Sequence, residues 1–188
     1  MNLFKSDLIR FYGKDCLTMK ELLLFPYELR WLWSFRMASK YKRNKFLFLP
    51  FYILYRHYTK VSQIQVPIGT KIGAGFYIGH VGRIIINPRS VLGKNINIAT
   101  GVTIGQTNRG RMKGAPTISD NVWIGTNAVI VGNVTIGTDV LIAPNTYINQ
   151  DIPSHSVVFG NPCVIKSRPN ATDSYIIIRY RVAYTNIF

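Results

Sequence analysis

Aliphatic residues recur at every sixth position through the second half of the chain. The runs are Val66, Ile72, Ile78 and Ile84; Ile86, Leu92, Ile98 and Ile104; and Ile118, Ile124, Ile130, Ile136, Ile142 and Ile148. A glycine often follows the aliphatic residue, and a small or apolar residue often lies four positions after it. A period of six is neither the 3.6 of a helix nor the 2 of a strand. It predicts a short strand and a tight corner, repeated, so that three hexads close one triangular coil.

Such a coil buries its inner face only against the next coil, so the pattern predicts a stack of coils. The series breaks twice. Between Ile84 and Ile86 the register slips by two, and Ile104 and Ile118 are fourteen residues apart instead of six. The second break leaves segment 105–116 without a ladder residue. We expect this segment to leave the stack and to project from one corner.

The chain before the repeats has a different character. Residues 1–64 are rich in Leu, aromatic residues, Lys and Arg, and contain a single glycine. Segments 20–24 and 27–45 have helical patterns, which predicts two or three short helices between about Leu17 and Tyr58. We therefore divide the chain into a helical region (1–64), a repeat domain (65–168) and a C-terminal tail (169–188). In the tail, 175–182 has strand composition.

Composition excludes several classes of protein. Of the 188 residues, 47% are hydrophobic and 16% charged, which excludes a wholly disordered chain. No apolar run reaches the roughly 18 residues of a membrane-spanning helix, and the charged first residues lack a signal-peptide core. Two cysteines, Cys16 and Cys163, are too few for a disulfide framework or a zinc site, and we interpret both as bystanders. These features predict a cytosolic protein.

The charge is strongly positive. The chain has 23 basic and 8 acidic residues, a net charge of +15, which predicts an anionic partner. Nucleic acid is disfavoured because no nucleic-acid-binding module is recognisable. The helical region pairs aromatic residues with cations. It either packs on the stack and between subunits or meets anionic lipid at the inner face of the membrane.

His80 is the candidate general base among three histidines. His57 lies in a basic aromatic stretch, and His155 lies in a Pro-Ser-His turn, so we expect packing or structural roles for these two. His80 follows Ile78 and Gly79, which places it at a corner or facing outward. The ring at that position has no packing role in the core. A histidine with a pKa of about 6.5 can accept the proton of a hydroxyl group near neutral pH.

The hexad pattern, with the closing segment 151–162, resembles the hexapeptide-repeat acyltransferases. The resemblance implies a mainly β fold, a left-handed parallel β-helix preceded by short helices and usually trimeric. It also implies acetyl-CoA as the co-substrate, with direct transfer of the acetyl group in a ternary complex. The metal-dependent β-helical enzymes of the carbonic anhydrase type need three converging histidines. Only His80 is well placed, so no metal is expected.

Residues 65–118 resemble the serine acetyltransferases most, in Lys71-Ile72-Gly73, Gly79-His80 and Val102-Thr103-Ile104-Gly105. That resemblance supports His80 as the base. The chain departs from the family at Gln65, where an Asp orients the histidine, and at Gly79, where an Asp helps hold the serine amine. It departs again at Gly114-Ala115, where Arg-His helps bind serine.

These departures favour a different acceptor. The chain looks closer to the enzymes of capsule and exopolysaccharide gene sets, and we predict acetylation of a sugar hydroxyl, on a free or lipid-linked sugar, in surface polysaccharide synthesis. Gln65 stays a candidate for orienting His80 through its amide oxygen. The alternatives are a serine O-acetyltransferase of cysteine synthesis and a non-catalytic trimeric scaffold.

Coenzyme A carries phosphates, so basic residues are expected near its cleft. By resemblance, its pantetheine arm lies along a coil edge between two subunits, and its adenine end approaches the C-terminal segment. The CoA candidates on these elements are Gly105, Thr107, Thr126, Lys166 and Arg168. Three cations of the projecting segment either bind acceptor phosphates or are solvated: Arg109, Arg111 and Lys113.

Overall fold

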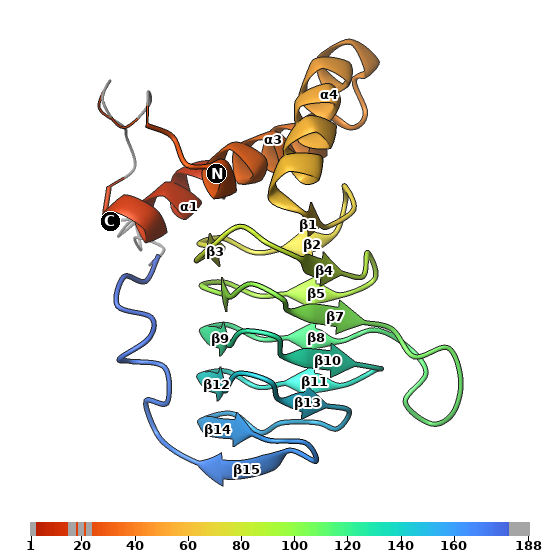
Figure 1. Ribbon diagram of the computed structural model, residues 1–188, viewed down its shortest axis with the longest axis vertical. Coiled ribbons are helices and arrows are strands. Elements are labelled where there is room, and N and C mark those ends of the chain that lie inside the picture. Colours follow the sequence, from red (N-terminus) through yellow and green to blue (C-terminus); the bar gives the residue numbers. More distant parts are fainter. Residues whose placement is uncertain (1–2, 15–17, 19–20, 22–23, 181–188) are drawn as a thin grey trace, which may run out of the picture.

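Over the residues that the structure describes, three helices precede a stack of short strands in the computed structural model of the protein (Figure 1). The structure describes residues 3–14, 18, 21 and 24–180. Helix α1 spans Leu3–Tyr12, α3 spans Tyr27–Tyr41 and α4 spans Lys45–Ser62. The first helix begins earlier than the sequence predicts and α4 ends later. Most of the predicted helical segment 20–24 lies outside the described residues.

The strands form three sheets, which are the three sides of a prism. Sheet A holds β1 (Ile64–Gln65), β4 (Ile84–Ile86), β7 (Thr103–Gly105), β10 (Val129–Val131) and β13 (Tyr147–Ile148). Sheet B holds β2 (Lys71–Ile72), β5 (Val91–Leu92), β8 (Thr117–Ile118) and β11 (Thr135–Ile136). Sheet C holds β3 (Tyr77–Ile78), β6 (Asn97–Ile98), β9 (Val122–Ile124), β12 (Val140–Ile142), β14 (Ser156–Phe159) and β15 (Val164–Ser167). All these pairings are parallel except that of β14 with β15, which closes the stack.

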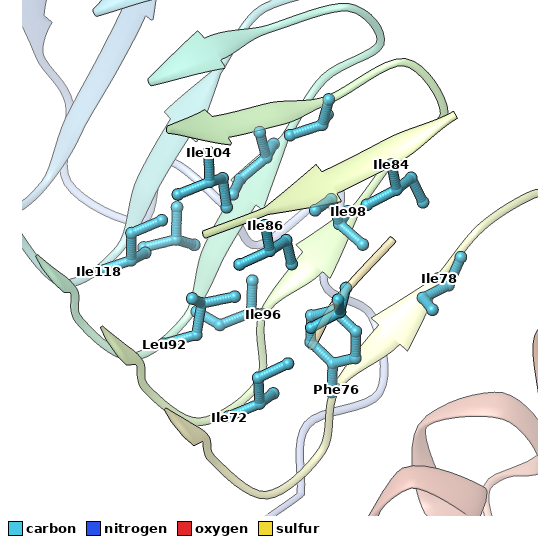
Figure 2. Close-up of a cluster of buried hydrophobic side chains, with 14 of the residues drawn as sticks. Ile72, Phe76, Ile78, Ile84, Ile86, Leu92, Ile96, Ile98, Ile104 and Ile118 are labelled. Carbon is cyan, nitrogen blue, oxygen red and sulfur yellow. The ribbon is translucent and has the colours of Figure 1, made fainter. Parts of the chain in front are cut away.

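The six-residue ladder is the core of the prism. Ile72 pairs with Leu92 and Leu92 with Ile118, each one coil further along the stack. Figure 2 shows these side chains converging inside the coils, and most of them are fully buried. The prediction of a mainly β stack of triangular coils is confirmed.

Both breaks of the period have a structural counterpart. Between β3 and β4 the corner is lengthened and carries His80. Between β7 and β8 the chain leaves the stack as a long loop, as predicted (Figure 1). The base of that loop is closed by two backbone hydrogen bonds of 2.9 Å between Thr107 and Gly114.

A buried ion pair fastens the helices to the first coil. Arg36 of α3 donates to Asp7 of α1 through Nε (2.9 Å) and Nη2 (3.1 Å). The same guanidinium donates to the carbonyl oxygens of Ile72 and Gly73, each at 2.7 Å, while Asp7 accepts from the amide of Phe76 at 2.9 Å. No coil precedes this one, so its edge groups need other partners. The ion pair supplies them.

The tail runs back across the coils of sheet C and is not part of any strand up to Tyr180 (Figure 1). Tyr175 packs on Trp123 of β9 with ring centroids 4.8 Å apart. Asn95 donates to the carbonyl of Tyr180 at 3.0 Å, and Asn97 donates to that of Tyr175 at 3.3 Å. The strand composition of 175–182 therefore does not form a strand over its described part. A segment that crosses the coils meets side chains rather than a strand edge.

Candidate functional site

The corner between β3 and β4 presents His80 to solvent. His80 is exposed, and the corner is held by a 2.9 Å hydrogen bond from the Gly82 amide to the Ser62 carbonyl. Gly82 has φ = +143°, and a Cβ atom there would lie 2.1 Å from Oγ1 of Thr100 on the next coil. Only glycine fits this position, because the φ and the contact both exclude a side chain. The corner is thus in close contact with the next coil at Gly82, and His80 lies at the surface.

Thr126 shares the prism edge of His80. The corners that join sheet C to sheet A carry His80 in one coil, Thr100 in the next and Thr126 in the one after. Backbone hydrogen bonds connect the lower two corners, from the Asn127 amide to the Thr100 carbonyl at 3.0 Å. Thr126 is therefore placed along one edge with the candidate base.

Gly105 and Thr107 lie at the opposite end of sheet A. They begin the loop between β7 and β8, whereas His80 lies where the chain enters the sheet. Five residues separate Thr100 from Gly105, a span of about 17 Å at the strand rise of about 3.3 Å per residue. One chain does not bring these loop residues to its own His80. The loop cations Arg109, Arg111 and Lys113 are exposed there as well.

Lys166 and Arg168 lie at the far end of the stack. Lys166 pairs with Val157 in the last strand pair, and its Nζ lies 5.5 Å from the centroid of the Phe159 ring. Arg168 donates its amide to the His155 carbonyl at 2.7 Å. Five strand spacings in sheet C, about 24 Å at about 4.8 Å each, separate β15 from the coil of His80.

Gln65 lies on sheet A beside β4, paired with Ile85. It is exposed and lines a hollow of about 560 Å³ between α4 and the sheet, together with Arg56, Lys60 and Asn87. Among the hydrogen bonds of the described residues, none joins Gln65 to His80. The orienting role predicted for Gln65 stays a prediction.

Glu28 is a neighbour of His80 that sequence reasoning missed. It lies in the first turn of α3, and its Oε1 accepts a hydrogen bond of 3.1 Å from the amide of Val81. That nitrogen is about 2.4 Å from the Cα atom of the preceding residue. The Glu28 carboxylate therefore lies within about 5.5 Å of the His80 Cα atom. The pattern offered one weak signal, an acidic residue in a helical first turn, and this does not reveal the partner.

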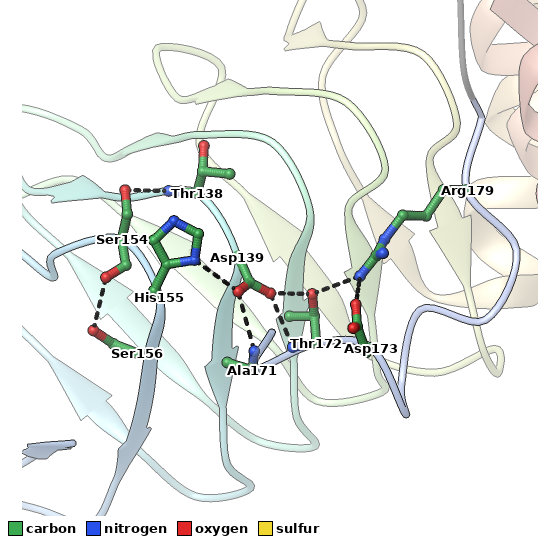
Figure 3. A network of polar contacts seen from close by, with 9 residues as sticks. All are labelled: Thr138, Asp139, Ser154, His155, Ser156, Ala171, Thr172, Asp173 and Arg179. Carbon is green, nitrogen blue, oxygen red and sulfur yellow. Dashed lines mark hydrogen bonds and ion pairs between the residues drawn. The ribbon is translucent and has the colours of Figure 1, made fainter. Parts of the chain in front are cut away.

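His155 belongs to a polar network that anchors the tail (Figure 3). Its Nδ1 lies 2.9 Å from Oδ2 of Asp139. The same oxygen accepts from the amide of Ala171 at 3.0 Å, and Oδ1 accepts from the hydroxyl of Thr172 at 2.6 Å. Burial alone would raise the pKa of Asp139, but the hydrogen bonds from Thr172, His155 and Ala171 outweigh it and lower that pKa. This geometry agrees with the structural role predicted for His155.

The described part of the chain offers few other groups that could bind a metal or act as a nucleophile. No group of three or more His, Cys, Asp or Glu side chains there is arranged to hold a metal ion. Cys163 carries a free thiol, whereas Cys16 lies outside the described residues. None of the described helices is long and apolar enough to cross a membrane.

A prism of six-residue repeats with a histidine exposed at one corner defines the class of protein. This is a hexapeptide-repeat acyltransferase with a left-handed β-helix. The family model described as bacterial transferase hexapeptide (six repeats) matches residues 115–150. The serine acetyltransferase of Bacillus subtilis (strain 168) is 30% identical over 167 residues, which cover 85% of this chain and 74% of that protein.

Solved structures agree. The serine acetyltransferase of Neisseria gonorrhoeae in complex with serine has a TM-score of 0.72 and 28% identity, covering 88% of this chain and 68% of that one. The Brucella abortus strain S19 enzyme in complex with coenzyme A has the same TM-score at 21% identity, covering 89% of this chain and 67% of that one. This last likeness shows the fold alone. The chain belongs to the serine acetyltransferase family, and it is an acyltransferase that uses acetyl-CoA as its co-substrate.

Proposed function

We propose that the protein transfers the acetyl group of acetyl-CoA to the hydroxyl of serine, with His80 as the general base. The observation that carries this proposal is the similarity to the Bacillus subtilis enzyme, which extends over 85% of the chain. It favours serine over the sugar acceptor that the sequence departures predict. Polysaccharide synthesis finds no support in the relatives' names.

The chemistry needs one base and two ordered substrates. The thioester of acetyl-CoA is already activated, so no enzyme nucleophile is required. His80 accepts the hydroxyl proton as the oxygen attacks the thioester carbonyl carbon. The carbon–sulfur bond then breaks, the thiolate regains a proton from the imidazolium, and the products are the acetyl ester and CoA.

A trimer would complete this site. Gly105, Thr107 and the loop cations lie at the other end of sheet A from His80 in one chain, so a neighbouring subunit has to supply them. Its loop would also cover the exposed ring of His80, which would exclude water and strengthen polar interactions. The CoA roles of Thr126, Lys166 and Arg168 belong to the same proposal.

Glu28 supports serine as the acceptor. The chain lacks the carboxylates expected at position 65, to orient the base, and at position 79, to hold the amine. Glu28 supplies one carboxylate from another element, within about 5.5 Å of the His80 Cα atom. A carboxylate at that place can accept hydrogen bonds from the ammonium group of serine.

A sugar hydroxyl, free or lipid-linked, is the second candidate acceptor. It is favoured by the neutral residues Gln65 and Gly79 and by the hollow beside Gln65, whose wall carries Arg56 and Lys60. Those two cations suit an anionic or phosphorylated sugar. The two candidates differ in whether a carboxylate or a cation makes the decisive contact with the acceptor.

Release of the CoA thiol from acetyl-CoA distinguishes the candidates. Wild type, His80→Ala and the matched control His57→Ala would be offered free serine, sugars and nucleotide sugars. We expect release with serine that His80→Ala abolishes and His57→Ala leaves intact. Release with a sugar alone would transfer the proposal to the second candidate. Equal release by wild type and His80→Ala would remove His80 from its role. Acetyl-CoA binding without any release would favour the scaffold alternative.

A further inference from the structure

One face of α4 exposes large apolar side chains. Phe46 is 93% exposed, Leu49 57% and Ile53 59%. The spacings of three and four place them on one side of the helix, so they form a continuous stripe. The opposite side of α4 packs on α3, where Phe51 lies edge-on to Trp33 with ring centroids 5.4 Å apart. The stripe therefore belongs to a helix that is already fixed to the protein.

The charged residues on α4 and in the turn before it are all positive. Lys42, Arg43 and Lys45 surround its N-terminal end, and Arg56 and Lys60 follow it, all of them exposed. The chain contains no Asp or Glu from Leu29 to Ser119. An apolar stripe with such a border is complementary to a surface that offers hydrocarbon beneath negative charges.

The position of α4 leaves this face accessible in the single chain. Figure 1 shows α4 rising beyond the first coil, at the end of the stack opposite β15. A second copy docked face to face on the same stripe would oppose its own cations to those of its partner. Like charges at a contact are unfavourable, so the charge pattern favours an anionic surface over a two-fold contact between copies through this stripe.

We propose that α4 docks the protein on an anionic phospholipid surface, with Phe46, Leu49 and Ile53 entering the interface. Lys42, Arg43 and Lys45 lie against the headgroups. The helix lies on the membrane and does not span it. This inference does not depend on the identity of the acceptor, although it would bring the enzyme to a lipid-linked one.

Co-sedimentation of the full-length protein with vesicles tests the proposal. One vesicle is phosphatidylcholine alone, and the other is an equal mixture of phosphatidylcholine and phosphatidylglycerol. We expect binding to the mixture only, weakening as salt is raised. The double variant Phe46→Ser/Ile53→Ser is expected to bind about tenfold more weakly, because it removes two inserted side chains. The triple variant Lys42→Gln/Arg43→Gln/Lys45→Gln is expected to lose the preference for the anionic vesicle.

The matched control is Ile177→Ser, an exposed apolar residue of the tail (85% exposed), which should leave vesicle binding unchanged. The oligomeric state of each variant is measured by analytical ultracentrifugation. Failure of wild type to bind, or equal binding to both vesicles, would overturn the proposal. A smaller oligomer for Phe46→Ser/Ile53→Ser would also overturn it, because the stripe would then be a contact between copies. An equal loss for Ile177→Ser would show that the binding is nonspecific.

Discussion

The buried ion pair between Asp7 and Arg36 offers the sharpest test of how the helices are held. The Asp7 side chain is 0% exposed and that of Arg36 is 6% exposed. Asp7→Ala leaves the guanidinium buried without its counterion and the Phe76 amide without its acceptor. Breaking a buried pair in this way costs about 3–5 kcal/mol. For a chain of this length that loss corresponds to a fall in Tm of about 2–4 °C per kcal/mol.

The double variant Asp7→Leu/Arg36→Met separates charge from packing. It removes both charges, and its remaining cost is that of three backbone groups: the carbonyls of Ile72 and Gly73, which lose their donor, and the amide of Phe76, which loses its acceptor. Such groups cost about 1–3 kcal/mol each when left unsatisfied. We therefore expect the double variant to lose far less stability than the sum of its two single variants. Urea unfolding at one fixed protein concentration, followed by circular dichroism, measures all four proteins.

Additivity would refute this reasoning. If the two single losses simply sum in the double variant, the two side chains do not act as one unit. A loss below about 1 kcal/mol for Asp7→Ala would refute it as well, because a buried cation would then be tolerated without its partner.

The remaining predictions concern pH, the acceptor and the corner. Burial raises the pKa of Asp7, and Arg36 opposes that rise; Arg36→Met should therefore lose stability as pH rises above the ordinary carboxyl range, and a flat pH profile would contradict this. Asp139, whose pKa is lowered, should contribute stability that is complete above its usual 3.8 and lost as pH falls below it; unfolding curves of Asp139→Asn should lack that acid dependence. Glu28→Gln should raise KM for serine about tenfold with little change in KM for acetyl-CoA, and an unchanged serine KM would exclude the amine contact. Gly82→Ala should lower the unfolding free energy by about 1–3 kcal/mol more than Gly110→Ala, since both have positive φ but only Gly82 meets a neighbouring side chain; equal losses would show that the contact relaxes.

The six-residue period was sufficient to predict the prism, its ladder and the long loop. Each inward position, such as Ile98, meets the same position of the next coil, so a local rule written in the sequence repeats along the whole stack. The same rule predicted that His80 lies outside the core, because it follows the ladder residue Ile78 and Gly79. The similarity to serine acetyltransferases then favoured serine over a sugar as the proposed acceptor. The sequence could not decide that point, since it showed which carboxylates were missing but not that Glu28 lies beside His80.

The sequence by itself thus determined the stack and the place of its candidate base, because those depend on neighbouring hexads. Only the tertiary structure decided what meets the stack from outside. Glu28 accepts a hydrogen bond from Val81, 53 positions away in the sequence. Asp139 accepts one from Ala171 of the tail, 32 positions away. These contacts join elements of different periodicity, so no repeat or spacing encodes them. They depend on the angles at which the helices and the tail pack on the prism, and those angles are set by the summed burial of many side chains.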